Sequence, residues 1–114
     1  MKLGIRHVAD VVVLDFKGDL VGGPDALRVQ ETVTGLLAEG RRKFLLNLDK
    51  VDFVNSSGVG IVVAAFTAIK NGGGAMKLCN ANDKVSRIMV ITKLLEVFDS
   101  YYKEAEALEA FKTG

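Results

Sequence analysis

The stretch LNLDKVDFVNSSGVG, residues 46–60, contains the step from strand to helix around which this chain is organised. The apolar run at residues 44–49 is typical of a buried strand. Asn55 and two serines then precede a long apolar run, and Asn and Ser are preferred helix N-caps because their side-chain oxygens accept free backbone N–H groups. The stretch therefore predicts a strand over residues 44–49 and, after a loop, a helix that begins at residues 55–58 and ends near Asn71.

Strands and helices alternate outward from this stretch. β-branched and apolar runs predict strands over residues 3–7, 11–16, 76–79 and 97–98. Helical spacing of apolar residues, with Pro24 and Asn82 at helix starts, predicts helices over residues 24–39, 82–95 and 103–112. The alternation predicts an α/β fold with parallel strand pairs at its centre, and the length of 114 residues fits one domain over residues 1–114.

The composition is that of an ordinary globular domain without a strong electric field. Hydrophobic residues make up 49% of the chain, and 15 basic and 14 acidic residues leave a net charge of +1. That balance predicts no binding to nucleic acid. The longest uncharged apolar run, residues 59–69, is too short to span a bilayer, so we expect no direct membrane insertion. No apolar leader follows Met1, and we expect a cytoplasmic protein.

Residues that could support catalysis or bind a metal are few. His7 is the only histidine and Cys79 the only cysteine, so metal clusters and a Ser-His-Asp triad have little support. Gly58 and Gly60 lack the further spacing of a dinucleotide-binding motif. We therefore expect no enzymatic activity, no catalytic residue, no bound metal and no cofactor.

The predicted helix after Asn55 is apolar on all sides. We assign one face to the core, namely Val62, Val63, Phe66 and Ile69. The opposite face also lacks charge and consists of Ser57, Gly60, Ile61, Ala64, Ala65 and Ala68. Such a helix is either buried on both sides or offers a face to a partner. Packing under a neighbouring helix is one interpretation, and docking of another protein is the one we favour in so short a chain.

The start of the same helix carries two hydroxyl groups. Capping accounts for one of them. A phosphoryl group here would be stabilised by the free N–H groups and the dipole of the helix start. It would also add about −1.5 to −2 charges beside the uncharged face. Desolvating that charge in an interface would cost several kcal/mol, which is sufficient to switch binding.

The residues 46–60 resemble the signature of STAS domains, especially those of anti-sigma-factor antagonists, in which Asp-Ser-Ser/Thr-Gly-Leu/Val-Gly begins a helix after a strand. The resemblance extends over essentially the whole chain, through residues 18–20, the glycine pair at 72–73 and the leucine-rich passage at 93–98. It implies a small mixed β-sheet with helices packed mainly on one face. One departure is Asn55, which stands where the family usually has Asp; it keeps the capping oxygen but removes a negative charge.

The resemblance also implies a partner switch. The unphosphorylated form would bind an anti-sigma factor that is also a serine protein kinase and so release a sigma factor. Phosphorylation of the first serine of the motif would break that complex, and a serine phosphatase would restore it. Carried onto this chain, the acceptor is Ser56, with Ser57 as the alternative. The partner-binding residues would be Asp19, Leu20, Val21, Gly22, Asn55, Ser57, Gly58, Ile61 and Ala64.

Two other functions stay open at this point. The chain could be a STAS scaffold or accessory subunit of a larger complex, such as a signalling assembly or a lipid-transport ATPase, in which Ser56 serves only as a cap. It could also bind a small molecule or nucleotide through the Asp19 loop and the helix start. We expect the free domain to be a monomer or a weak dimer.

Overall fold

The computed structural model describes residues 1–91 and 99–113 of the chain. Its strands are β1 (Lys2–Val8), β2 (Val11–Lys17), β3 (Lys43–Lys50), β4 (Ala75–Cys79) and β5 (Asp99–Tyr101). Its helices are α1 (Pro24–Ala38), α2 (Ser56–Asn71), α3 (Asp83–Ile91) and α4 (Glu104–Thr113). The predicted strand at residues 97–98 lies outside the described residues, as does the end of the predicted helix at residues 92–95. The other predicted elements are confirmed to within two residues at either end.

The strands form one five-stranded mixed sheet in the order β1-β2-β3-β4-β5. β1 and β2 are antiparallel and meet at a two-residue turn, whereas β2, β3, β4 and β5 are parallel neighbours. α1 connects β2 to β3, and α2 connects β3 to β4. Parallel neighbours need such a crossover because the chain has to return to the same end of the sheet. The predicted α/β fold with a mixed sheet is therefore confirmed.

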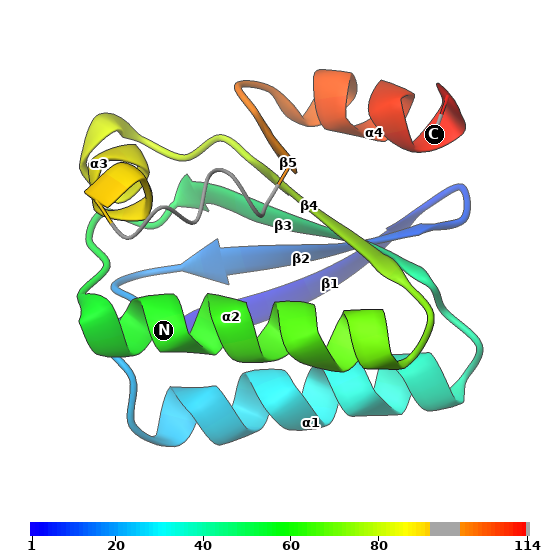
Figure 1. Cartoon of the computed structure of the whole chain (residues 1–114), viewed down its shortest axis with the longest axis horizontal. Helices are drawn as coiled ribbons and strands as arrows, with labels where there is room; N and C mark the ends of the chain where they lie inside the picture. The colour runs from blue at the N-terminus through cyan, green and yellow to red at the C-terminus, as the bar shows by residue number, and fades with distance from the viewer. Residues whose placement is uncertain (92–98, 114) are drawn as a thin grey trace.

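Helices cover the two faces of the sheet unequally (Figure 1). α1, α2 and Val85 of α3 pack with Val12, Leu14 and Phe16 of β2 in the larger core. α4 lies alone on the opposite face, where Ala107 and Phe111 complete a smaller core with β2, β3 and β4. The helices thus lie mainly on one face, and α2 lies beside α1 on the sheet.

The loops that follow β2 and β3 lie at the same end of the molecule because the two strands are parallel. The carboxyl ends of β2 and β3 lie at the end of the sheet where α2 begins and where α3 lies (Figure 1). Loops at the carboxyl ends of parallel strands are the usual location of binding sites in such sheets. The loop at residues 18–23, the loop at residues 51–55 and the first turn of α2 therefore form one surface.

Candidate functional site

The loop after β2 is hydrogen-bonded to the loop after β3. The Leu20 N–H donates to the Phe53 carbonyl oxygen at 2.9 Å, and the Asn55 N–H donates to the Leu20 carbonyl oxygen at 3.2 Å. Leu20 and Val54 also form an isolated parallel bridge. These bonds extend the pairing of β2 and β3 past the strand ends and fix the position of Asn55, which precedes α2.

Asn55 is the N-cap of α2. Its backbone is extended, and its side-chain oxygen Oδ1 accepts a hydrogen bond from the Gly58 N–H at 2.8 Å. The next helical bond, from the Val59 N–H to the Asn55 carbonyl oxygen, is 2.9 Å long. The cap is therefore supplied by the amide, so neither serine is needed for it. The prediction that the helix begins at residues 55–58 is confirmed.

Ser56 and Ser57 occupy the first two positions of α2, and both are exposed. Within the part of the chain that the structure describes, neither hydroxyl has a hydrogen-bond partner. The first turn of α2 contains no acidic residue, and Lys70 lies in its last turn. The free N–H groups and the positive end of the helix dipole are therefore uncompensated beside the two hydroxyls.

Two glycines allow the loop after β2 to lie directly against α2. A Cβ atom on Gly58 would lie 1.8 Å from the Leu20 carbonyl oxygen, so no side chain fits at this position. Gly22 has a φ of +92°, and a Cβ atom there would lie 2.8 Å from Cβ of Ser57. Both glycines, which are predicted to belong to a binding surface, also allow the loop and the helix start to lie in direct contact.

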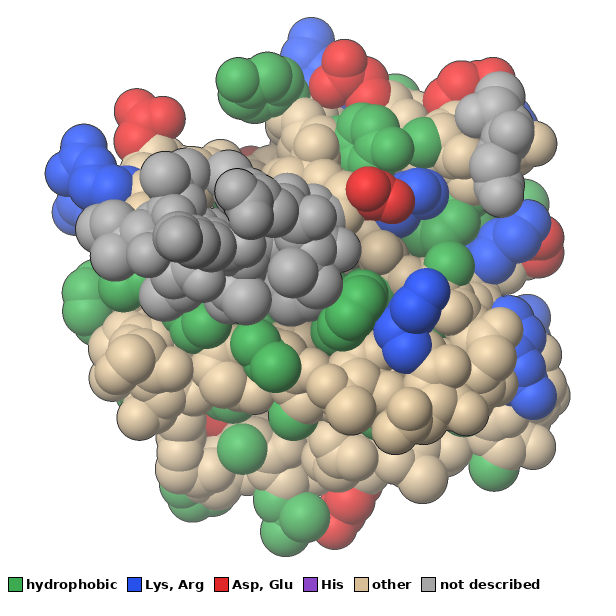
Figure 2. Space-filling model, in the orientation of Figure 1, with side chains coloured by type: hydrophobic (Ala, Val, Ile, Leu, Met, Phe, Trp, Pro, Cys, Tyr) green, Lys and Arg blue, Asp and Glu red, His purple; other side chains and the backbone are tan. Residues whose placement is uncertain are grey.

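The outward surface around Ser56 is partly apolar. The side chains of Val21 and Phe53 are 45% and 48% exposed, although both are large and hydrophobic. Asp19 and Ala64 are exposed as well. Figure 2 shows that the molecular surface over α2 carries small and hydrophobic side chains, with basic side chains only toward its C-terminal end. Phe53 is absent from the predicted surface because the loop at residues 51–55 could not be placed from the sequence.

The prediction of the two faces of α2 is partly wrong. Ile61 is 3% exposed and Ala65 is 1% exposed, because the buried stripe of the helix packs on the sheet and against α1. Val63, assigned to the core, is 36% exposed. The exposed residues of α2 include Ser56, Ser57, Gly60, Val63, Ala64, Thr67 and Lys70. Of the predicted partner-binding residues, Ile61 and Leu20 have side chains that are buried in the core.

A row of polar side chains crosses the sheet under the start of α4. The Arg6 Nη2 group donates to Asp15 Oδ1 at 2.8 Å, the Asn47 Nδ2 group donates to the same oxygen at 2.8 Å, and the Asn80 Nδ2 group donates to Asn47 Oδ1 at 2.9 Å. The bond to Arg6 holds the pKa of Asp15 below its ordinary value, although partial burial opposes the shift. These side chains are hydrogen-bonded to one another, which is typical of a structural network.

Cys79 adjoins this row and is fully buried. Burial, together with the nearby carboxylates of Glu104 and Asp15, raises the pKa of its thiol to about 12. A thiol with that pKa is almost wholly protonated at neutral pH and is a poor nucleophile. Among residues 1–91 and 99–113, no group of three His, Cys, Asp or Glu side chains is arranged to hold a metal ion.

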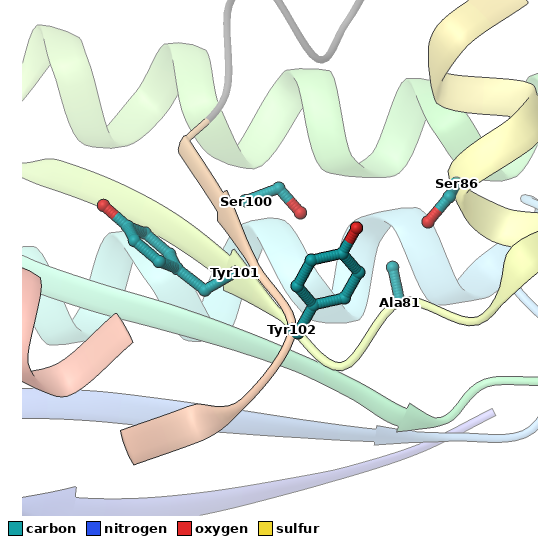
Figure 3. A pocket seen from close by; sticks show the side chains of 5 residues that line it. All are labelled: Ala81, Ser86, Ser100, Tyr101 and Tyr102. Atoms are coloured by element: carbon teal, nitrogen blue, oxygen red, sulfur yellow. The ribbon is translucent and has the colours of Figure 1, made fainter. Parts of the chain in front are cut away.

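A separate pocket of about 240 Å³ lies between α3 and β5. Figure 3 shows Ser86 on α3 on one side of it, with Ser100 and Tyr102 approaching from the β5 segment. The described lining consists of hydroxyl, aromatic and methyl groups and contains no carboxylate, amine or imidazole. The described residues of the pocket therefore form no acid–base pair, and they are distinct from those of the surface around Ser56.

The comparison with known proteins agrees with this architecture. The STAS domain model matches residues 2–107, and the chain belongs to the STAS domain family. It is similar to the anti-sigma F factor antagonist of Paenibacillus polymyxa, with 22% identity over 108 residues that cover 95% of this chain and 92% of the relative. Such anti-sigma factor antagonists are the proteins that this chain resembles by sequence.

Solved structures show the same fold. One is the crystal structure of a Thermotoga maritima protein provisionally named an anti-sigma factor antagonist. It matches with a TM-score of 0.85 and 28% identity, and the match covers 95% of this chain and 92% of the Thermotoga chain. The Bacillus cell fate determinant SpoIIAA in its phosphorylated form has a TM-score of 0.75 and 19% identity, with coverage of 96% and 99%. No helix in the described ranges has both the length and the hydropathy needed to cross a bilayer.

Proposed function

We propose that this chain is an anti-sigma factor antagonist whose binding to its partner is controlled by phosphorylation of Ser56. The observation that carries the proposal is the exposed Ser56 hydroxyl, which lies at the start of α2 and is not used as a cap because Asn55 caps the helix. A kinase can reach such a hydroxyl without disturbing the fold. The names of the relatives and the phosphorylated state of SpoIIAA support the same reading.

The proposed partner is an anti-sigma factor that also acts as a serine protein kinase, and a serine phosphatase resets the switch. The proposed contact surface is formed by Asp19, Val21, Gly22, Asn55, Ser57 and the exposed residues of α2 as far as Ala64. Gly58 contributes by holding the loop after β2 in place. Leu20 and Ile61 have buried side chains and support this surface from the core.

The physical basis of the switch is the charge of one phosphoryl group. It adds about −1.5 to −2 charges at neutral pH, and in the free protein these are stabilised by the start of α2 and by water. A partner on the apolar surface around Val21 and Phe53 would remove that water. Because a charge without a partner costs several kcal/mol to bury, the phosphorylated form releases the partner. The coupling of about 1–3 kcal/mol that is typical of regulated binding is well within this cost.

A kinase assay tests the acceptor. The protein is incubated with an anti-sigma-type serine kinase and ATP, and its intact mass is measured for wild type, Ser56→Ala and Ser57→Ala. The two variants remove the same hydroxyl group one position apart, so each serves as the control of the other. We expect one phosphoryl group on wild type and on Ser57→Ala and none on Ser56→Ala. Phosphorylation of Ser56→Ala that is lost in Ser57→Ala would move the acceptor to Ser57.

A binding assay separates the switch from a permanent scaffold. Ser56→Asp places a negative charge at the switch position, whereas Ala64→Glu places one on the outward face of α2. The switch predicts that Ser56→Asp weakens binding to the anti-sigma partner at least tenfold. A scaffold predicts that Ala64→Glu abolishes assembly and that Ser56→Asp has little effect. Wild-type affinity in Ser56→Asp would contradict the proposed function.

A further inference from the structure

A small groove lies beside the proposed switch, between the loop after β3 and α3. Its lining combines two basic with three apolar residues, namely Phe53, Val54, Lys84, Arg87 and Ile88. Its volume of about 190 Å³ is below the roughly 300–1,000 Å³ of small-molecule sites, so it suits a single large side chain better than a metabolite. In Figure 2, basic side chains and an acidic one project from the end of the molecule at which α3 lies.

The two basic side chains are available to a partner. Lys84 and Arg87 are exposed and lie one turn apart on α3, and the structure gives neither an ion pair nor a hydrogen bond with any described residue. Asp52 and Asp83 are near in sequence but do not line the groove. Phe53 forms the apolar side, with half of its side chain exposed. The described lining of the groove therefore contains two cationic side chains beside apolar ones and no carboxylate.

We propose that this groove binds an acidic segment of the anti-sigma partner, with one large apolar side chain inserted beside Phe53 and carboxylates placed at Lys84 and Arg87. The identity of the partner rests on the proposed function, whereas the chemistry of the segment follows from the groove itself. Complementary charge around an apolar anchor is the arrangement that gives such contacts their specificity and their rate of association.

The position of the groove explains how a phosphoryl group on Ser56 would act on it. Phe53 precedes Ser56 by three residues, so their Cα atoms are at most about 11 Å apart. That distance is comparable with the Debye length of about 8 Å at physiological salt. The added negative charge would therefore lie close to the apolar side of the groove, where the large side chain of the acidic segment is proposed to insert. Phosphorylation would thus weaken this contact as well as the contact at the start of α2.

A peptide titration followed by NMR tests the groove without a natural partner. The probe is the synthetic peptide Glu-Asp-Leu-Phe-Glu-Asp-Leu-Glu, and its matched control replaces each Glu by Gln and each Asp by Asn. We expect the acidic peptide to shift the backbone amide signals of residues 53–54 and 84–88, and the shifts to weaken between 50 and 300 mM salt, concentrations chosen so that screening is clearly increased. Absence of these shifts, or equal shifts with the amide control, would overturn the proposal.

Charge reversal supplies the second arm of the test. The double variant Lys84→Glu, Arg87→Glu should bind the acidic peptide at least tenfold more weakly. The matched control is Lys103→Glu, Lys112→Glu, which makes the same change of net charge on and beside α4. Thermal melting verifies that both variants are folded. Equal loss of peptide binding in both variants would show a nonspecific effect of charge and would refute the proposed binding site. Phosphorylation of Ser56 is measured separately, so failure of the switch and failure of the groove are distinguishable.

Discussion

Substitution of Gly58 by alanine tests how closely the loop after β2 packs against α2. The new Cβ atom would lie 1.8 Å from the Leu20 carbonyl oxygen and 2.4 Å from its carbonyl carbon. Ordinary contact distances are about 3.5 Å, so the backbone of the loop has to move by roughly 1.5 Å. This movement strains the two hydrogen bonds that join Leu20 to Phe53 and to Asn55.

The expected loss of stability can be estimated from these contacts. Overpacking costs about 1–3 kcal/mol. Each weakened backbone hydrogen bond costs about 0.5–1.5 kcal/mol. The higher helix propensity of alanine returns up to about 1 kcal/mol. The net effect is a free energy of unfolding lower by about 1–5 kcal/mol and, for a domain of this size, a Tm lower by about 4–20 °C.

The chain offers a matched control two residues away. A Cβ atom on Gly60 would meet nothing within 4 Å. Gly60→Ala should therefore raise the free energy of unfolding by about 0.5–1 kcal/mol, because alanine restricts the unfolded chain. Urea denaturation followed by circular dichroism measures both variants. If Gly58→Ala were as stable as wild type, or were stabilised like Gly60→Ala, the described packing of the loop on α2 would be refuted.

Three further predictions concern the cap, the polar row and the buried thiol. Asn55→Ala should lower the free energy of unfolding by about 1 kcal/mol, whereas Asn55→Asp should retain the cap; equal urea midpoints for the two variants would contradict this. Because Arg6 lowers the folded-state pKa of Asp15 from its ordinary value of 3.8, its ion pair contributes stability above that pH, which is lost as the pH falls through the folded pKa. Asp15→Asn should therefore flatten the decline in urea midpoint below about pH 4, and an unchanged decline would exclude this origin. With a pKa of about 12, the thiol of Cys79 should react with Ellman's reagent at pH 8 only after unfolding, and complete reaction of the native protein within seconds would contradict its burial.

The positions of most strands and helices follow from local signals in the sequence. Asn55 before the two serines fixes the start of α2, and Pro24 fixes the start of α1, because both features act through the backbone of their own helix. The five-stranded order and the lone position of α4 on the second face were not predicted from local signals. The family resemblance supplied the mixed sheet and the unequal covering of its faces.

The faces of α2 could not be assigned from its pattern. The helix carries apolar residues on all its sides, so helical spacing alone allows two choices of the buried face. Packing against α1 and the sheet selects the face with Ile61 and Ala65. The role of Gly58 was hidden for a similar reason, since its neighbour Leu20 lies in another loop. Contacts between residues that are distant in sequence carry this information, and a single sequence does not display them.

The cap supplied by Asn55 separates two properties of this domain that a serine cap would have joined. The side-chain hydrogen bond that caps α2 joins Asn55 and Gly58, so the Ser56 hydroxyl takes no part in it. Replacing Ser56 by alanine should therefore remove the proposed acceptor and leave the cap in place. In this domain the proposed acceptor and the cap of its helix are two different side chains.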